Sequence, residues 1–135
     1  MQNNFTKTVP VYISVFNNPT YLENFIEQLE NNGVTNVKIV DSNSTFPRMK
    51  QLLESIERKY EVIRLDNNFG PHYLLRVKKV YDSLPKFFCL SDPDLKLSKD
   101  LPIDFINELK IVSESHKIGK VGLALEVLKN RRCFT

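Results

Sequence analysis

Two carboxylates separated by one residue are the part of this chain best suited to chemistry. Asp92 and Asp94 flank Pro93, whose ring fixes one backbone torsion between them. Carboxylates held this close repel each other, a divalent cation removes that repulsion, and hard oxygen ligands suit Mg²⁺ or Mn²⁺. Such a cation commonly bridges substrate phosphates. The chemistry therefore points to a nucleoside diphosphate as the ligand.

The place of this pair in the chain matters more than its spacing. An Asp-x-Asp triplet arises by chance in about one chain in three of this composition. Here the triplet directly follows the apolar run at 87–90, which we expect to be a buried strand. A strand end holds two carboxylates more precisely than a mobile loop does.

The elements that would position the pair are strands alternating with amphipathic helices. Alternating or continuous apolar runs predict five strands, at 9–16, 37–40, 62–65, 87–90 and 121–128. Apolar residues at helical spacing predict four helices, at 21–29, 49–56, 73–84 and 102–112. This order predicts an α/β fold: a mainly parallel, open, Rossmann-like sheet of about five strands with helices on both faces.

Residues on either side of the predicted helix at 21–29 indicate where it begins and ends. Thr20 followed by Glu23 fits a capping box at its start. Gly33 is well placed to end the helix in the left-handed conformation. These signals predict a helix confined between residues 20 and 33.

Composition indicates one globular domain spanning residues 1–135. The chain is 41% hydrophobic and 26% charged, and its net charge of +3 comes mostly from the basic run at 129–132. Lys and Arg are otherwise scattered among Glu, which argues against nucleic-acid binding, and no window is apolar enough for a transmembrane segment. Cys89 and Cys133 do not form a disulfide framework, and Cys89 is expected to be a buried thiol. We expect a cytoplasmic protein, with a peripheral position at the inner membrane face as the alternative.

Each predicted strand up to 90 is followed by a polar cluster. The clusters are Asn17-Asn18, Asp41-Ser42-Asn43, Asp66-Asn67-Asn68 and Ser91-Asp92-Pro93-Asp94. The carboxyl ends of parallel strands lie at one edge of a sheet, where open α/β sheets bind ligands. The four clusters are therefore expected to line one crevice.

Taken singly, each cluster also fits ordinary turn chemistry, because Asn, Asp, Ser and Pro hydrogen-bond their own backbone. For Asn17 before Asn18-Pro19, helix capping is the favoured interpretation. For Asp41, a strand end and a contact with ribose or base are evenly balanced. Gly70 before Pro71 fits either a phosphate-binding backbone or a plain helix start.

Several other kinds of site lack their motifs. The chain has no Gly-x-Gly-x-x-Gly after a strand, no P-loop and no Gly-x-Ser-x-Gly nucleophile elbow. His72 and His116 lack zinc-ligand spacing to a cysteine. A receiver-type domain would need acidic residues where this chain has Asn17-Asn18. Dinucleotide, P-loop, zinc and serine-hydrolase chemistry are thus disfavoured.

The same segments resemble family 2 glycosyltransferases and their relatives with the A-type (nucleotide-diphospho-sugar transferase) fold, over residues 9–127. VYISVFNN at 11–18 resembles the first strand and nucleotide loop, and IVDSNS at 39–44 the second-strand segment. DNNFGP at 66–71 resembles the Asn-x-Gly segment before the third helix, and LSDPD at 90–94 the metal motif. The resemblance implies a donor-binding N-terminal part that uses a nucleotide-activated sugar, often a UDP-sugar, with Mg²⁺ or Mn²⁺.

The resemblance also implies roles for single residues. Asp94 would bind the metal, and Asp92 would contact the ribose or reach the metal through water. Asp41 and Phe16 would lie beside the nucleoside. Asn17 belongs to the nucleotide-loop segment, and Asn68 and Gly70 to the segment before the third helix.

The family places its catalytic base and acceptor-binding half after the fifth strand, and no base is identified in this sequence. A late carboxylate, Glu126, fits a solvated strand position better. We therefore expect a glycosyltransferase or its donor-binding part, truncated or dependent on a partner chain or homo-oligomer, with an unknown glycan or lipid-linked acceptor. The alternatives are a non-catalytic nucleotide-sugar-binding module and an α/β interaction domain without metal-dependent nucleotide binding.

Overall fold

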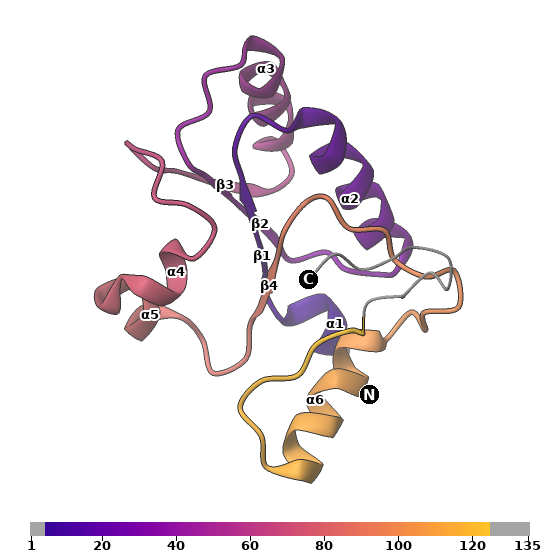
Figure 1. The fold of residues 1–135 in the computed structure, drawn as a ribbon. Helices are drawn as coiled ribbons and strands as arrows, with labels where there is room; N and C mark the ends of the chain where they lie inside the picture. The colour runs from indigo at the N-terminus through magenta and orange to yellow at the C-terminus, as the bar shows by residue number, and fades with distance from the viewer. Residues whose placement is uncertain (1–4, 125–135) are drawn as a thin grey trace, which may run out of the picture.

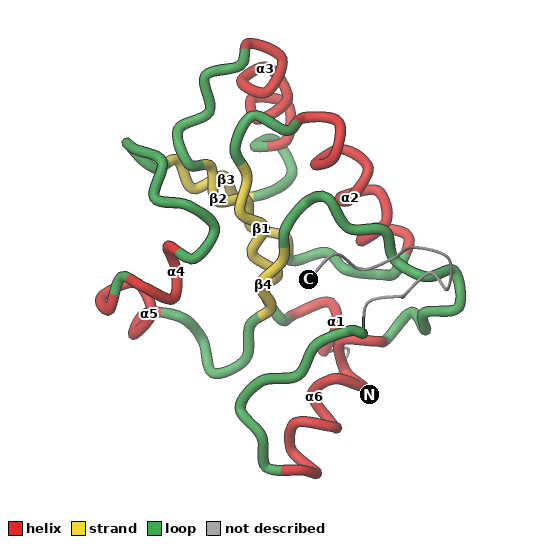
Figure 2. Tube along the Cα trace, in the orientation of Figure 1, coloured by secondary structure: helices red, strands yellow, loops and turns green. Residues whose placement is uncertain are grey.

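The computed structural model describes residues 5–124, along which strands and helices alternate (Figures 1 and 2). The strands are β1 (Val11–Val15), β2 (Val37–Asp41), β3 (Glu61–Arg64) and β4 (Cys89–Ser91). The helices are α1 (Phe5–Thr8), α2 (Pro19–Asn31), α3 (Pro47–Ile56), α4 (Tyr73–Arg76), α5 (Lys78–Ser83) and α6 (Phe105–His116).

The strands form one open, parallel sheet in the order β3-β2-β1-β4. From β1 the chain steps outward through β2 to β3, and β4 then returns to the other side of β1. The strand order therefore reverses between β1 and β4. Of the predicted fifth strand, residues 121–124 are not in a strand, and 125–128 lie outside the described residues. The described sheet has four strands rather than five.

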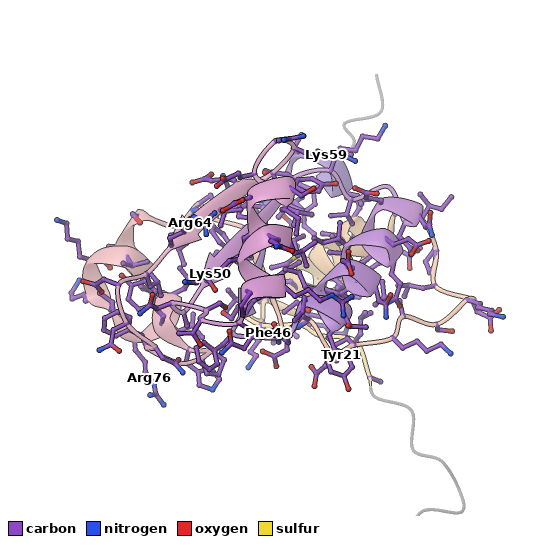
Figure 3. All side chains as sticks on the ribbon, turned by 90° about the horizontal axis from the view of Figure 1, so that it is seen from above. Tyr21, Phe46, Lys50, Lys59, Arg64 and Arg76 are labelled. Atoms are coloured by element: carbon purple, nitrogen blue, oxygen red, sulfur yellow. The ribbon has the colours of Figure 1, made fainter. Side chains whose placement is uncertain are left out.

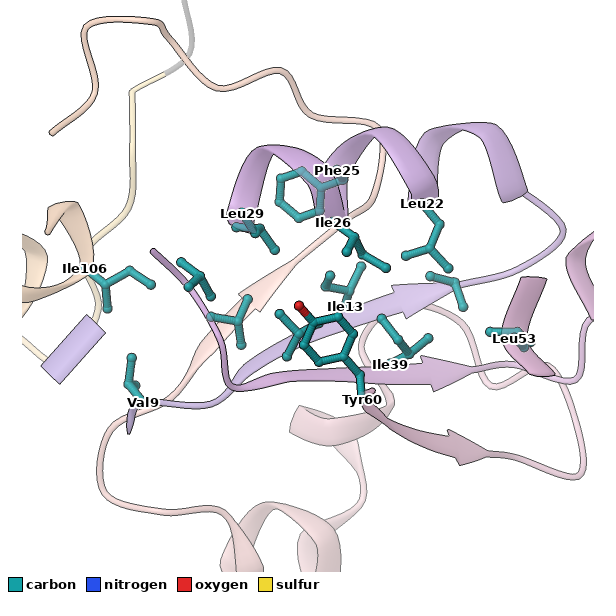
Figure 4. Packing of buried hydrophobic residues seen from close by; sticks show 14 of the residues in the cluster. Val9, Ile13, Leu22, Phe25, Ile26, Leu29, Ile39, Leu53, Tyr60 and Ile106 are labelled. Atoms are coloured by element: carbon teal, nitrogen blue, oxygen red, sulfur yellow. The ribbon is translucent and has the colours of Figure 1, made fainter. Parts of the chain in front are cut away.

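Helices cover both faces of the sheet, as the sequence predicts. The inward face of β1, including Ile13, packs under α2, whose apolar stripe is Leu22, Phe25, Ile26 and Leu29 (Figure 4). Tyr12 points to the opposite face, where it clusters with Val40 of β2 and Leu74 of α4. The period-two alternation of β1 thus serves two separate apolar clusters.

Helix α2 starts differently from the prediction and ends as predicted. Its N-cap is Asn18, with Pro19 in the first turn, so the capping box at Thr20 is wrong. Proline suits the first turn because its missing N–H has no partner to lose there. At the other end Gly33 has φ 77°, and the N–H groups of Gly33 and Val34 donate to Glu30 and Leu29 carbonyls. This pattern ends the helix in the expected left-handed turn.

The predicted helix at 73–84 is broken in two. Val77, in extended conformation with ψ 103°, separates α4 from α5. Leu74 is the buried residue of α4, and α5 has none. Short helices depend on packing for their stability, so with little buried surface a continuous helix is not enforced.

The strand at 87–90 is also less buried than predicted. The regular strand begins at Cys89, and Leu90 is 43% exposed. Among the described strands, β4 pairs with β1 only, so it lies at the edge of the sheet. Phe87 and Phe88 are partly buried, in edge-to-face contacts with Phe5 and Tyr12. The acidic pair is therefore delivered by an edge strand.

Candidate functional site

A groove with a volume of about 450 Å³ lies at the carboxyl edge of the sheet. Its walls come from the loops after β1 and β4, between which the strand order reverses, and from the loops after β2 and β3. Open α/β sheets bind ligands at this kind of position. The lining residues are Ser14, Val15, Phe16, Asn18, Tyr21, Ser42, Asn68, Gly70, Pro71, Asp92, Pro93 and Asp94.

The acidic turn forms one wall of the groove. Asp92 and Asp94 are exposed, whereas Pro93 between them is buried. The Ser91 hydroxyl donates to the Asp92 carbonyl at 3.0 Å, which fixes the turn as it leaves β4. Asp94 also lines a second groove, of about 510 Å³, beside α2. The two predicted metal ligands therefore face the same groove.

The charge of this groove is negative. Asp92 and Asp94 are the charged residues in its lining, and no lysine or arginine is among the lining residues of the described chain. Within residues 5–124, no group of three or more His, Cys, Asp or Glu gathers in a metal-binding arrangement. A cation here would take two protein carboxylates at most and would keep positions for water and phosphate oxygens.

The residues of the loop after β1 face either the groove or the loop after β2. Phe16 is 42% exposed and lines the groove. Asn17, at φ 51°, turns its side chain toward the loop after β2, where Oδ1 accepts from the N–H groups of Thr45 and Phe46 at 2.8 and 2.9 Å. Asn17 thus ties two loops together and is not in the groove lining.

Asp41 is also engaged inside the protein. The residue is only 4% exposed, and its carboxylate accepts from the N–H of Ser44 and, at 2.5 Å, from the Ser44 hydroxyl. The Ser44 hydroxyl in turn accepts from the Asn17 N–H at 3.0 Å. Asp41 does not line the groove, and its neighbour Ser42 does.

The loop after β3 contributes Asn68 and Gly70 to the groove. Asn68 Oδ1 accepts from the Gly70 N–H at 3.0 Å, and Gly70 has φ 76°. The backbone donor considered for phosphate binding is therefore already used. The helix that follows, α4, begins only at Tyr73 and has four residues. Its start offers no developed helix N-terminus for an anion.

Hydrogen bonds connect these loops around the groove. Asn17 joins the loops after β1 and β2, and Asn43 Nδ2 donates to the Asp66 carbonyl at 3.3 Å, joining those after β2 and β3. The Ser14 hydroxyl donates to the Pro71 carbonyl at 3.1 Å. Bonds of this kind hold the groove in shape before a ligand arrives.

Sequence reasoning did not assign Ser14, Asn18, Tyr21 or Ser42 to the site as single residues. Ser14 is the polar position in the apolar run of β1, which is a usable signal. Tyr21 is 58% exposed in the first turn of α2, and its side chain is labelled in Figure 3, which looks down on the fold. Helical periodicity assigned Tyr21 to the core face, so that signal pointed the other way.

Several solved structures share this fold, among them two of S. aureus TarS. S. aureus TarS, a glycosyltransferase, aligns with a TM-score of 0.56 at 19% identity, and a second structure, of TarS 1-349, aligns with a TM-score of 0.56 at 18% identity. Over the aligned residues, this chain therefore shares the α/β fold of these two structures. The alignments cover 81% of this chain but only 20% and 33% of the two TarS chains. No family model and no curated protein sequence matches the chain.

At this level of identity the likeness concerns the fold. It agrees with the predicted α/β class and with the parallel sheet between two helical layers. Within residues 5–124, no helix is both long and apolar enough to span a lipid bilayer.

Proposed function

We propose that this chain is the donor-binding part of a glycosyltransferase. It binds a nucleotide-diphospho-sugar, with a UDP-sugar favoured, and the sugar passes to a glycan or lipid-linked acceptor. The observation that carries the proposal is the groove at the strand-order reversal, where Asp92 and Asp94 are the charged lining residues of a glycosyltransferase-like fold.

The negative charge of the groove requires a cation if a diphosphate is to bind there. A diphosphate would be repelled by two carboxylates with no basic residue in the described lining. Mg²⁺ or Mn²⁺ held by Asp94, with Asp92 beside it or contacting the ribose, reverses the local charge. When bound, the ion would stabilise the negative charge on the diphosphate leaving group.

The remaining lining residues suit the uncharged part of the donor. The exposed ring of Phe16 offers an apolar face to a nucleobase, while Ser42 and Asn68 offer polar groups to hydroxyls or base edges. Asp41 and Asn17 support these residues through the Ser44 network. In this arrangement the chain binds and orients the donor and holds water-accessible carboxylates at the diphosphate end.

Thermal unfolding with UDP, GDP or CMP, each with and without Mn²⁺, tests the proposal. A ligand at a hundredfold above its Kd stabilises the folded state by about 2.7 kcal/mol. We expect a stabilising shift with UDP that Mn²⁺ enlarges. A flat response to all three nucleotides, with and without Mn²⁺, would overturn the proposal.

A non-catalytic nucleotide-sugar-binding module is the second candidate. The observation that favours it is the groove lining. Among the described residues, the lining contains no histidine or glutamate that could act as a catalytic base, and its carboxylates are those of the acidic pair. Transfer from a UDP-sugar, or slow hydrolysis of the donor, separates the two candidates. Binding of UDP without any turnover would favour the module.

A further inference from the structure

The acidic turn is anchored on both sides. On one side β4 pairs with β1, with Ser91 opposite Ile13. On the other side the segment after Asp94 runs past α2 (Figure 1), and the side chain of Gln28 in α2 forms hydrogen bonds with the backbone of this segment. Gln28 Nε2 donates to the Leu95 carbonyl at 3.1 Å, and Oε1 accepts from the Leu97 N–H at 2.6 Å.

The amide of Gln28 is held in one orientation. Nε2 also donates to the Asn24 carbonyl, one turn earlier in α2, at 3.2 Å. Gln28 is half-buried, and its neighbours Ile26 and Leu29 are fixed in the core. A side chain on a packed helix with its donors and acceptor all engaged is a rigid support.

This support acts on Asp94 through the backbone. Leu95 follows Asp94 directly, so the short segment between Ser91 in β4 and the Leu95 carbonyl is held at both ends. Pro93, which is buried, restricts one torsion within this segment. Without Gln28, nothing comparable holds the segment after Asp94 against α2 among the hydrogen bonds of residues 5–124.

We propose that Gln28 is a positioning residue: it sets the direction of the Asp94 carboxylate and thereby the affinity for the cation and diphosphate. The inference rests on the proposed function and deepens it. The side-chain hydrogen bonds of Gln28 go to the backbone of Asn24, Leu95 and Leu97, and Gln28 does not line the groove at the carboxyl edge, so its effect on a ligand there would pass through Asp94. Loss of a partner that hydrogen-bonds directly to a metal ligand typically lowers metal affinity by about 10–100-fold, and a residue that acts through the backbone is expected at the lower end of that range.

The test compares Gln28→Met with Gln51→Met. Met keeps the length and helix propensity of Gln but removes both bonds to 95–97. Gln51 is an exposed glutamine of α3, so its variant controls for the substitution itself. Calorimetry measures the Kd of UDP with Mn²⁺, of UDP without metal, and of uridine. We expect Gln28→Met to weaken Mn²⁺-dependent UDP binding about tenfold and to leave uridine binding unchanged.

Amide hydrogen exchange at Leu97 gives a second measurement that needs no ligand. In Gln28→Met this amide should exchange faster, because its acceptor is gone. Faster exchange with unchanged Mn²⁺-dependent affinity would overturn the inference. An equal loss of UDP and uridine binding would overturn it too, as the sign of a general structural role. If the wild-type chain does not bind Mn²⁺ and UDP at all, the proposed function itself fails.

Discussion

Hydrogen bonding divides the polar residues at the carboxyl edge into two groups. The side-chain oxygens of Asp41 accept from Ser44 in the loop that follows it, and Oδ1 of Asn17 accepts from two N–H groups in that same loop. Asp92 and Asp94 are exposed and line the groove, and within residues 5–124 their carboxylates belong to no such network. The first group shapes the site, and the second is available to a ligand.

Asp94→Asn should abolish the Mn²⁺-dependent part of the UDP-induced thermal shift. The amide keeps the size of the side chain but removes the charge that attracts the cation. Asp100→Asn is the matched control, because Asp100 is exposed and lies outside both grooves. An undiminished Mn²⁺-dependent shift in Asp94→Asn would mean that the metal site is elsewhere.

Asn17→Ala should destabilise the fold by about 2 kcal/mol, measured by urea unfolding. Two N–H groups lose their acceptor, and alanine is strained at the φ of 51°. Asn17→Gly relieves the backbone part and should cost less. Asn17→Asp keeps the acceptor and should be the mildest of the three. If Asn17→Asp is as damaging as Asn17→Ala, the acceptor role is wrong.

At the scale of elements, periodicity predicted the four strands of the described sheet and the helices α2, α3 and α6, whereas the strand expected at 121–128 is not formed at 121–124. The alternation at 9–16 and the stripe at 21–29 became β1 and α2, because both bury their apolar faces in one core. The 73–84 stripe gave two short helices, since its apolar residues find little to pack against. The spacing of apolar residues does not reveal whether the rest of the protein offers a surface for them to pack against.

The sequence predicted which loops form the candidate site, but not which side chains of those loops line the groove. That four polar clusters share one edge follows from parallel strands, and the structure has them there. Which residue of each cluster turns inward depends on local torsions, as in Asn17 with its positive φ. Sequence spacing carries no information on that choice, so Ser42 was not distinguished from Asp41.

Gly33→Ala should cost about 1 kcal/mol, because the C-terminal turn of α2 needs a positive φ. An added Cβ would also lie 3.2 Å from Ile103 Cγ2, but Ile103 is 69% exposed and can yield. Gly70→Ala has a similar φ of 76° and no atom within 4 Å, so it isolates the backbone cost. Urea unfolding of both variants should give similar losses.

Gly119→Ala is the control for the substitution itself, since Gly119 has neither a positive φ nor a close neighbour. It should change stability less than the other two. A much larger loss in Gly33→Ala than in Gly70→Ala would show that the contact with Ile103 is rigid. No loss in Gly33→Ala would contradict the left-handed turn at the end of α2.

For the whole molecule, the cysteine of the edge strand β4 makes the free energy of unfolding depend on pH in the alkaline range. Burial raises the pKa of the Cys89 thiol from 9.0 to about 11. Between these values the unfolded chain has lost the thiol proton and the folded chain retains it. The contribution of this thiol to stability is therefore constant well below pH 9 and falls as the pH rises from about 9 toward 11.

Cys89→Ala should remove this part of the pH dependence. At pH 10 the wild-type protein should have lost about 1 kcal/mol of stability relative to pH 7 through this thiol. This follows because pH 10 lies about one unit above the pKa of the unfolded thiol and one unit below that of the folded one. Other groups also titrate in the alkaline range: burial raises the pKa of Tyr60, and the hydrogen bond to Glu30 raises the pKa of Lys59. Because both proteins share these groups, urea unfolding of each at pH 7 and pH 10 isolates Cys89. If the two proteins lose equal stability between these pH values, the thiol does not stay protonated in the folded edge strand.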